Sequence, residues 1–315
     1  MVSHNLGVAR SRFIADKSLT TRMTLVMFLL GALLVALVVT VAYVLGSSAG
    51  PGVGVLVAVI GIGIAVWQWS NSDKVAMRAM NAQEVTPEQA PELHGVIDRL
   101  CALADMPKPR VGIAHTDVPN AFATGRSPQR SVVCVTTGIL NLLTPEELEG
   151  VLAHELSHVA HRDVLVMTVA SSAGIVAGML TQGSRFGAYG MLGGRRNNNN
   201  GLPVWLVILV VSMVVYAVSF VLLRLLSRYR ELSADRAGAY LTMRPAALAS
   251  ALQKITGGIN ATPKKDLREV SAASALCIAP AIAGVNLKTL TSTHPSLEQR
   301  LEQLAKIQSD LGRPS

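Results

Sequence analysis

The sequence predicts a mainly α-helical membrane protein, in which transmembrane helices are combined with an α+β domain that contains a small sheet with an edge strand. Only 15% of the 315 residues are charged and 50% are hydrophobic, whereas soluble domains carry about 25% charged residues. Charge-free apolar stretches reach the length of about 20 residues that a helix needs to span a bilayer. The more polar parts of the chain show helical apolar spacing and short β-branched runs.

The first apolar region predicts a transmembrane hairpin over residues 23–70. No charged side chain occurs in Thr24–Ser72. Thr24–Leu45 has the length of a membrane span, Gly46–Gly52 indicates a tight turn, and Val53–Trp69 is a second, shorter span. A cleaved signal peptide is a poorer interpretation, because the run is too long and no small-residue cleavage site is followed by a polar domain.

A second pair of apolar segments, Val164–Gln182 and Pro203–Leu223, predicts a further hairpin over residues 164–226. The Asn-rich loop between them contains three arginines, which disfavours moving it across the membrane. The apolar length of the second segment favours crossing, because that run would otherwise expose much apolar surface to water. We therefore expect a double crossing. A hairpin that only enters the bilayer, or a buried helical pair, are the alternatives.

Basic residues beside the spans predict the orientation. Four of them precede the first span, and the turn Gly46–Gly52 has none. By the positive-inside bias, the segment 1–22 and the domain after Ser70 face the cytoplasm, in a multi-pass protein of the cell (inner or plasma) membrane. The net charge of +8 has the same explanation, because the basic residues flank apolar stretches and aromatics make up only 4% of the chain. We expect the lipid bilayer, and no nucleic acid, as a partner.

The polar regions predict several helices and two strands. Pro91–Leu103 has helical apolar spacing, whereas Arg110–Ala114 and the β-branched run Ser131–Thr136 indicate strands. Further helices are expected over Pro245–Ile255 and Pro295–Ile307. The three cysteines form no CxxC pair, so neither a disulfide framework nor a cysteine zinc site is expected.

Thr144 begins the most informative helix. It can cap the helix, Pro145 takes the first helical position, and Glu147 completes a capping box. The helix is expected to continue to about Ala160.

This helix carries His154 and His158, which lie four residues apart and therefore on one face, where both imidazoles can bind one ion. Glu155 lies beside the first histidine and can reach a water on that ion. The three residues form the HExxH signature of zinc peptidases. Two surface histidines are the alternative reading. The apolar neighbours argue against it, because a buried His or Glu without a function is costly.

Catalytic zinc takes three protein ligands, and Glu231 is the best candidate for the third. Asp235 lies four residues later on the same helical face, so it could accept the N–H of a ligand histidine. His161 is the competing ligand by spacing, but it would lie a further turn along the same short helix. Without the HExxH motif, Glu231 and Asp235 would be read as a solvated helical face.

The sequence resembles the HtpX-type membrane zinc metalloproteases, which are related to the CAAX prenyl-protein endopeptidases. The resemblance extends from Met23 to about Arg300. It implies the zinc ligands His154, His158 and Glu231, the base Glu155, a cytoplasmic active site and the removal of damaged or misassembled membrane proteins. The matching segments are Asn120–Gly125, Val135–Gly138, Thr144–His158, Ser227–Glu231, Ala234–Arg236 and His294–Ser296.

These observations together predict a gluzincin-like catalytic domain built from residues 71–163, with the HExxH helix, and residues 227–315, with the third ligand and the C-terminal helices. It would bind one Zn²⁺ per chain and hydrolyse peptide bonds of misfolded or damaged membrane proteins, with Glu155 as proton acceptor. Ser131–Thr136 is the candidate edge strand for pairing with an extended substrate.

Two further residues are weaker candidates for the site. Asn120 could fix the substrate backbone, and His294 could stabilise the oxyanion. The alternative is that Asn120 only makes a turn and His294 only begins the last helix.

Two other functions remain open. A processing protease for one membrane or prenylated substrate is less favoured, because at most four spans are expected and none forms a large chamber. A non-proteolytic membrane regulator with structural zinc is disfavoured by Glu155, because a structural site needs no base and closes four ligands.

Overall fold

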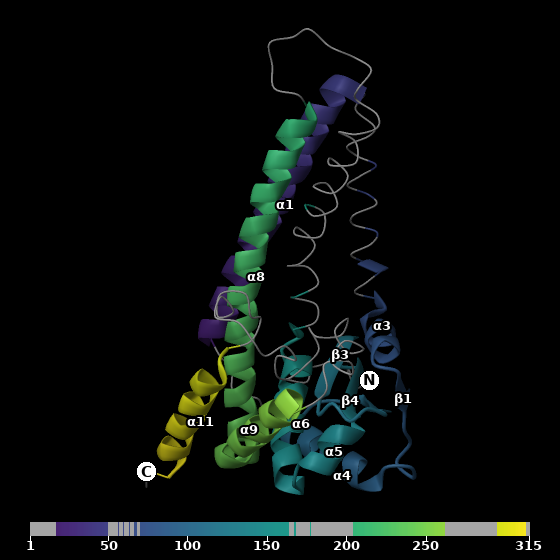
Figure 1. Cartoon of the computed structure of the whole chain (residues 1–315), viewed down its shortest axis with the longest axis vertical. Helices are drawn as coiled ribbons and strands as arrows, with labels where there is room; N and C mark the ends of the chain where they lie inside the picture. Colours follow the sequence, from purple (N-terminus) through teal and green to yellow (C-terminus); the bar gives the residue numbers. More distant parts are fainter. Residues whose placement is uncertain are drawn as a thin grey trace, which may run out of the picture. The chain divides into compact units, whose positions relative to one another are not determined.

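The structure, a computed structural model, describes residues 17–49, 56, 59, 63, 66–67, 70–163, 167, 177, 204–261 and 295–312. These residues form mainly helices and one four-stranded sheet (Figure 1). The chain divides into two compact units. The helical unit comprises residues 18–70 and 165–226, and the sheet unit comprises residues 1–17, 71–164 and 227–315.

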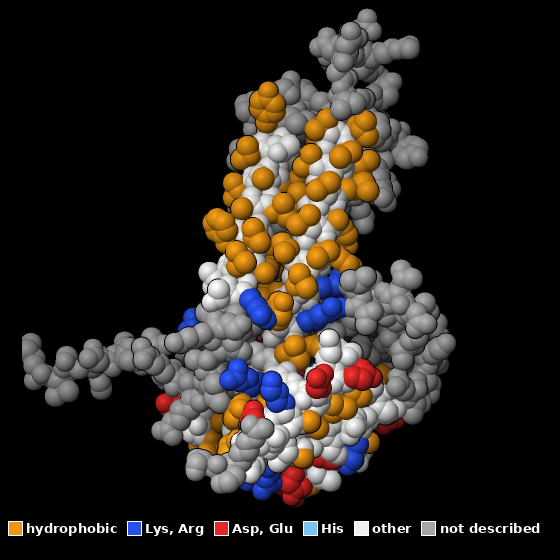
Figure 2. Space-filling model, turned by 90° about the vertical axis from the view of Figure 1, so that its left-hand side faces the viewer, with side chains coloured by type: hydrophobic (Ala, Val, Ile, Leu, Met, Phe, Trp, Pro, Cys, Tyr) orange, Lys and Arg blue, Asp and Glu red, His pale blue; other side chains and the backbone are white. Residues whose placement is uncertain are grey.

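The helical unit contains α1 (Lys17–Ala49) and the first part of α8 (Val204–Thr242). Among the described residues, the stretches Thr21–Thr40 and Leu206–Thr242 are long and apolar enough to cross a membrane. Figure 2 shows hydrophobic side chains covering the visible face of these long helices. Large apolar side chains exposed on them include Phe28, Val35, Val39, Val214, Tyr216 and Val221. An exposed apolar surface of this extent is typical of contact with lipid.

Apolar side chains pack α1 against the first part of α8. Val26 and Leu30 of α1 cluster with Leu226 of α8, and Leu37 of α1 clusters with Val215. The expected first span, residues 24–45, lies within α1.

The expected fourth segment, residues 203–223, coincides from Val204 with the beginning of α8. That helix continues to Thr242, so one helix joins the apolar segment to the residues expected to complete the metal site. Most of the expected segments 53–69 and 164–182, and the whole loop 183–201, lie outside the described residues.

The sheet unit contains a mixed sheet with the strand order β1-β2-β4-β3. β2 runs parallel to β4, whereas β1 pairs antiparallel with β2, and β3 pairs antiparallel with β4. The strands are β1 (Ala82–Glu84), β2 (Arg110–Ala114), β3 (Ala121–Ser127) and β4 (Arg130–Thr136).

The expectation that residues 131–136 form an edge strand is wrong. β4 is an inner strand between β2 and β3, and the edge on this side of the sheet is β3. Every residue of β4 after Arg130 is buried, as a continuous β-branched run on an inner strand should be. β3 was missed because Ala and Gly weaken its strand pattern. Gly125 has φ +145°, and a Cβ there would lie 2.3 Å from the carbonyl oxygen of Arg130.

Helices surround this sheet and bury the core. They are α3 (Ser72–Ala79), α4 (Pro91–Ala104), α5 (Thr137–Leu142), α6 (Pro145–Ala160), α9 (Pro245–Ala261), α11 (Leu297–Leu311) and the last part of α8. α6 contacts α4, α9, β3 and β4, and α11 packs on α9. The largest core side chains include Ile97, Leu100, Leu152, Leu156, Leu248, Leu252 and Ile255.

The capping expected for α6 is confirmed. The backbone N–H of Glu147 donates to Thr144 Oγ1, and the backbone N–H of Thr144 donates to Glu147 Oε2 over 2.9 Å. Glu147 also accepts hydrogen bonds from Ser250 and Lys254 of α9. The start of α6 is therefore fixed both by its own cap and by a neighbouring helix, which holds its histidines in place.

Candidate metal centre

Two helices of the sheet unit supply the centre. α6 carries His154, Glu155 and His158, and the last part of α8 carries Glu231 and Asp235; all five side chains are buried.

A glycine lets the two helices approach closely. A Cβ at Gly238 of α8 would lie 3.0 Å from the backbone nitrogen of His154. The absence of a side chain at this position therefore lets Glu231 reach both histidines.

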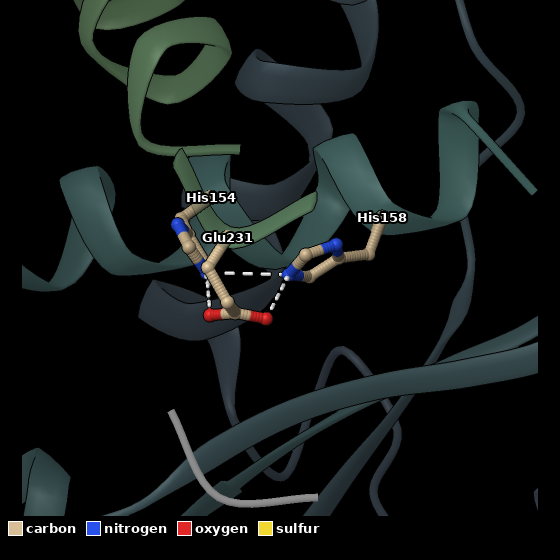
Figure 3. Close-up of side chains that lie close together, drawn as sticks. All are labelled: His154, His158 and Glu231. Carbon is tan, nitrogen blue, oxygen red and sulfur yellow. Dashed lines mark hydrogen bonds and ion pairs between the residues drawn. The ribbon is translucent and has the colours of Figure 1, made fainter. Parts of the chain in front are cut away.

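The carboxylate of Glu231 faces the Nε2 atoms of both imidazoles (Figure 3). Glu231 Oε2 is 3.5 Å from Nε2 of His154, and Oε1 is 3.5 Å from Nε2 of His158. The two Nε2 atoms are 3.3 Å apart. Among the described residues, these three form the group of His, Cys, Asp or Glu that could hold a metal ion, with ligand atoms within 4.8 Å of one another.

The other nitrogen of each imidazole faces a buried carboxylate. His154 Nδ1 lies 2.9 Å from Asp235 Oδ1, and His158 Nδ1 lies 2.6 Å from Asp163 Oδ2. Because an ionised carboxylate only accepts, each Nδ1 must carry the proton. With Nδ1 facing a carboxylate, the Nε2 atom of each imidazole is left on the side of Glu231 as the candidate ligand atom.

Both carboxylates are in turn paired with arginines. Arg300 of α11 donates from Nε to Asp235 Oδ2 over 2.7 Å and from Nη2 to Oδ1 over 2.6 Å. Arg230 of α8 lies with its Nε 2.9 Å from Asp163 Oδ2. Burial raises the pKa of each aspartate, but the arginine and the histidine outweigh it, so both pKa values are lowered and both groups are ionised.

The donor set fits a zinc ion. Two Nε2 lone pairs and one carboxylate converge, and they would repel one another unless a cation lay between them. The site also attracts a proton: burial lowers the pKa of His154, but hydrogen bonds to Asp235 and Glu231 outweigh it and raise the pKa to about 9. Two imidazoles and one carboxylate are the ligand set of one class of catalytic zinc site.

Glu155 lies beside this group on α6, and its Oε2 accepts a hydrogen bond of 2.9 Å from the backbone N–H of Ala123 in β3. Burial raises the pKa of Glu155, against the lowering effect of His154 and His158. A carboxylate whose pKa is raised toward neutrality is suited to accept and return a proton.

Three further residues were proposed from the sequence for the site, and they differ in where the structure places them. Asn120 is buried immediately before β3, and its backbone exchanges hydrogen bonds with Thr136. His161 follows α6 and does not belong to the group of ligand atoms. His294 lies outside the described residues.

Sequence reasoning missed Asp163, Arg230 and Arg300. Asp163 returns toward His158 because the chain reverses at Arg162, which has φ 56°. Its spacing of five residues after His158 was the available signal. Arg300 lies 65 residues after Asp235, so no local pattern could have linked the two.

The sequence matches a known peptidase family. Residues 87–308 match the model of peptidase family M48. This match includes the HExxH helix, Glu231, Asp235 and Arg300.

Curated relatives cover nearly the whole chain. It is 52% identical over 304 residues to "Protease HtpX homolog 1" of Streptomyces coelicolor, which covers 96% of this chain and 97% of that protein. It is 46% identical over 313 residues to "Protease HtpX homolog" of Moorella thermoacetica, covering 94% and 97%. The resemblance to HtpX-type proteases is therefore confirmed.

A solved structure shares the fold. The crystal structure of S. mikatae Ste24p aligns with a TM-score of 0.50 at 15% identity, and the alignment covers 92% of this chain and 66% of that one.

Proposed function

The chain belongs to peptidase family M48, and on this premise we propose that it is a zinc-dependent endopeptidase of the membrane. The observation that carries the proposal is the convergence of His154, His158 and Glu231 within 4.8 Å, with Glu155 beside them. The family and the two long apolar helices support a membrane protease.

His154, His158 and Glu231 would hold one Zn²⁺ per chain, and Asp235 would orient His154 through its Nδ1–H. Zinc bound there would polarise the scissile carbonyl and lower the pKa of an attacking water. Glu155 accepts the proton of that water and returns it to the leaving amine. Its burial supports this role, because burial brings the pKa of the carboxyl closer to that of a shuttling group.

The edge strand β3 supports a position for the substrate. The N–H of Ala123 points toward Glu155, so the outer edge of β3, which pairs with no other described strand, faces the proposed proton acceptor. An extended substrate that pairs with this edge would bring its carbonyl to Glu155. Asn120 lies at the beginning of the strand with its backbone fixed by Thr136, and we assign it the role of holding this end of the edge. For His294 we retain the proposal that it stabilises the oxyanion.

We infer that the substrates are misfolded or damaged membrane proteins and that the site faces the cytoplasm. The orientation follows from four basic residues before the first span and none in the turn 46–52. A strand edge binds a substrate through hydrogen bonds to its backbone, which do not depend on the identity of its side chains. It therefore suits substrates that share only an unfolded backbone, as expected in proteolytic quality control.

The direct test is proteolysis by the detergent-purified protein. The substrates are a destabilised and a stable variant of one membrane protein. Each is incubated with the wild-type enzyme in the presence of zinc or of a zinc chelator, and with the Glu155→Gln enzyme in the presence of zinc. We expect cleavage of the destabilised variant alone, only with zinc and only by the wild type. Zinc binding without cleavage of any substrate would instead support a structural zinc in a membrane regulator.

A further inference from the structure

Behind each ligand histidine lies an Arg–Asp pair. Arg300 and Asp235 form two hydrogen bonds behind His154, and both side chains are almost completely buried. Arg230 contacts Asp163 behind His158. The proton acceptor for each Nδ1–H is thus itself fixed by an arginine.

The two arginines come from different helices. Arg230 lies next to Glu231 on α8, whereas Arg300 lies on α11, the last helix of the chain. α11 is held by a second contact to α8, because Gln303 Nε2 donates to the backbone oxygen of Leu232 over 2.9 Å. Leu304 and Ile307 anchor the same helix in the hydrophobic core. The orientation of His154 therefore depends on the docking of α11.

The arginine fixes the orientation of Asp235. Asp235 has no exposed surface, and each of its carboxylate oxygens accepts a hydrogen bond from Arg300. The oxygen that accepts from Arg300 Nη2, Oδ1, is also the one that lies 2.9 Å from Nδ1 of His154. Without Arg300 the carboxylate would lose both contacts that hold it in place, and His154 would lose the partner that keeps its Nε2 turned toward the metal position.

We propose that Arg300 is a positioning residue for the metal and that docking of α11 completes the metal site. The inference rests on the proposed function, because it assumes that His154 binds zinc. Arg230 positions His158 in the same way through Asp163, which it contacts once, whereas Arg300 contacts Asp235 twice. By thermodynamic linkage, zinc must strengthen the docking of α11 by the factor by which α11 raises the zinc affinity.

The test is a double-mutant cycle on zinc affinity, measured with a competing chelating dye on the purified full chain. Arg300→Leu and Asp235→Leu are each expected to weaken zinc binding about 10–100-fold. The double variant should bind zinc no more weakly than Asp235→Leu alone, because Arg300 acts only through Asp235. Arg300→Lys keeps the charge with one contact fewer and should recover part of the affinity.

Arg99→Leu is the matched control. Arg99 of α4 forms a 2.8 Å ion pair with Glu149 of α6. This pair does not involve the ligand atoms, so the zinc affinity of Arg99→Leu should equal that of the wild type. The double variant Asp235→Leu/Arg300→Leu removes both charges of the buried pair, so neither is left without its partner. It therefore keeps the test decisive if Arg300→Leu alone does not fold. Its zinc affinity is then compared with that of Asp235→Leu and of Arg300→Lys.

Hydrogen exchange provides the second readout. Amides of α11 should exchange more slowly with zinc than with a chelator, and the difference should shrink in Arg300→Lys. Wild-type zinc affinity in Arg300→Lys and in the double variant would overturn the proposal. So would a further loss of affinity when Arg300 is removed from the Asp235→Leu background. If the wild-type protein bound no zinc at all, the proposed function would fail instead, and the two failures are thus distinguishable.

Discussion

The backbone N–H of Ala123 donates to the side chain of Glu155, with 2.9 Å between the nitrogen and Oε2. This bond connects the edge strand β3 to the HExxH helix at the group that we propose accepts the proton. We propose that the strand has two functions: it holds the carboxylate in place, and its outer edge, which pairs with no other described strand, binds the substrate beside that carboxylate.

Glu155→Gln should keep the fold and the zinc but abolish cleavage. The amide oxygen of Gln can still accept from Ala123, and Glu155 is not among the three metal ligands. Only the proton acceptor is lost, which costs about 10²–10⁴-fold in rate. Cleavage of casein is the assay, with metal content of the same sample as the control. A variant that cleaves at the wild-type rate would show that another group takes the proton.

Glu231→Ala should lose zinc, because two imidazoles alone hold the ion weakly. Asp235→Asn should do less, lowering affinity or activity about 10–100-fold, because it changes only a partner of His154. His161→Ala is the matched control and should retain zinc, since His161 lies outside the group of ligand atoms. Metal analysis of the three purified variants checks this order. Full zinc content in Glu231→Ala, with loss in His161→Ala, would reverse the ligand assignment.

Gly238→Ala should destabilise the protein by about 1–3 kcal/mol, the usual cost of overpacking. The new Cβ would lie 3.0 Å from the backbone nitrogen of His154 and 3.3 Å from its Cα, so α8 and α6 must separate. Gly95→Ala in α4 is the control, because nothing lies within 4 Å of its Cβ position. It should stabilise the helix by roughly 0.5–1 kcal/mol. Thermal unfolding in detergent compares the two, and equal shifts would argue against the close approach.

Zinc affinity should fall as the pH falls. The pKa of His154 without metal is raised to about 9, so below that pH the site holds a proton that zinc must displace. The apparent affinity should then decrease about tenfold per pH unit for one displaced proton. Zinc titrations between pH 6 and 8 measure this slope. Asp235→Asn should flatten it, because the carboxylate that raises the pKa of His154 is gone; a pH-independent affinity in the wild type would contradict the assignment.

The second hairpin should cross the membrane twice, with the loop 183–201 outside the cell. The apolar length of residues 203–223 favours this crossing, whereas the three arginines of the loop disfavour moving the loop across the membrane. Cysteines introduced at positions 184 and 198 of a cysteine-free variant can be treated with a membrane-impermeant thiol reagent. They should react on intact cells. Reaction only after the cells are opened would exclude the crossing but not the protease.

Local signals predicted the parts of the site that one helix contains. Thr144, Pro145 and Glu147 determine where α6 begins, and helical spacing then places both histidines on one face. Glu231 and Asp235 could be proposed because i and i+4 share a face of a helix. Each of these inferences depends on neighbours within about one turn of a helix.

Non-local pairing limited the rest. The position of residues 131–136 within the sheet depends on β2 and β3, which pair on either side of them, and burial along the strand was the only hint. The partnership of Arg300 with Asp235 depends on how α11 packs on α8, which sequence spacing does not encode. Such contacts are determined by the tertiary fold rather than by local propensity.

The central claim is that one zinc, held by His154, His158 and Glu231, makes this chain a peptidase. The most direct measurement is a zinc titration of the metal-free, detergent-purified protein, followed by its cleavage of unfolded casein. The account predicts no cleavage without zinc, a linear rise that ends at one zinc per chain, and no rise in Glu155→Gln. Undiminished cleavage by the metal-free protein, or a wild-type rise in Glu155→Gln, would contradict it.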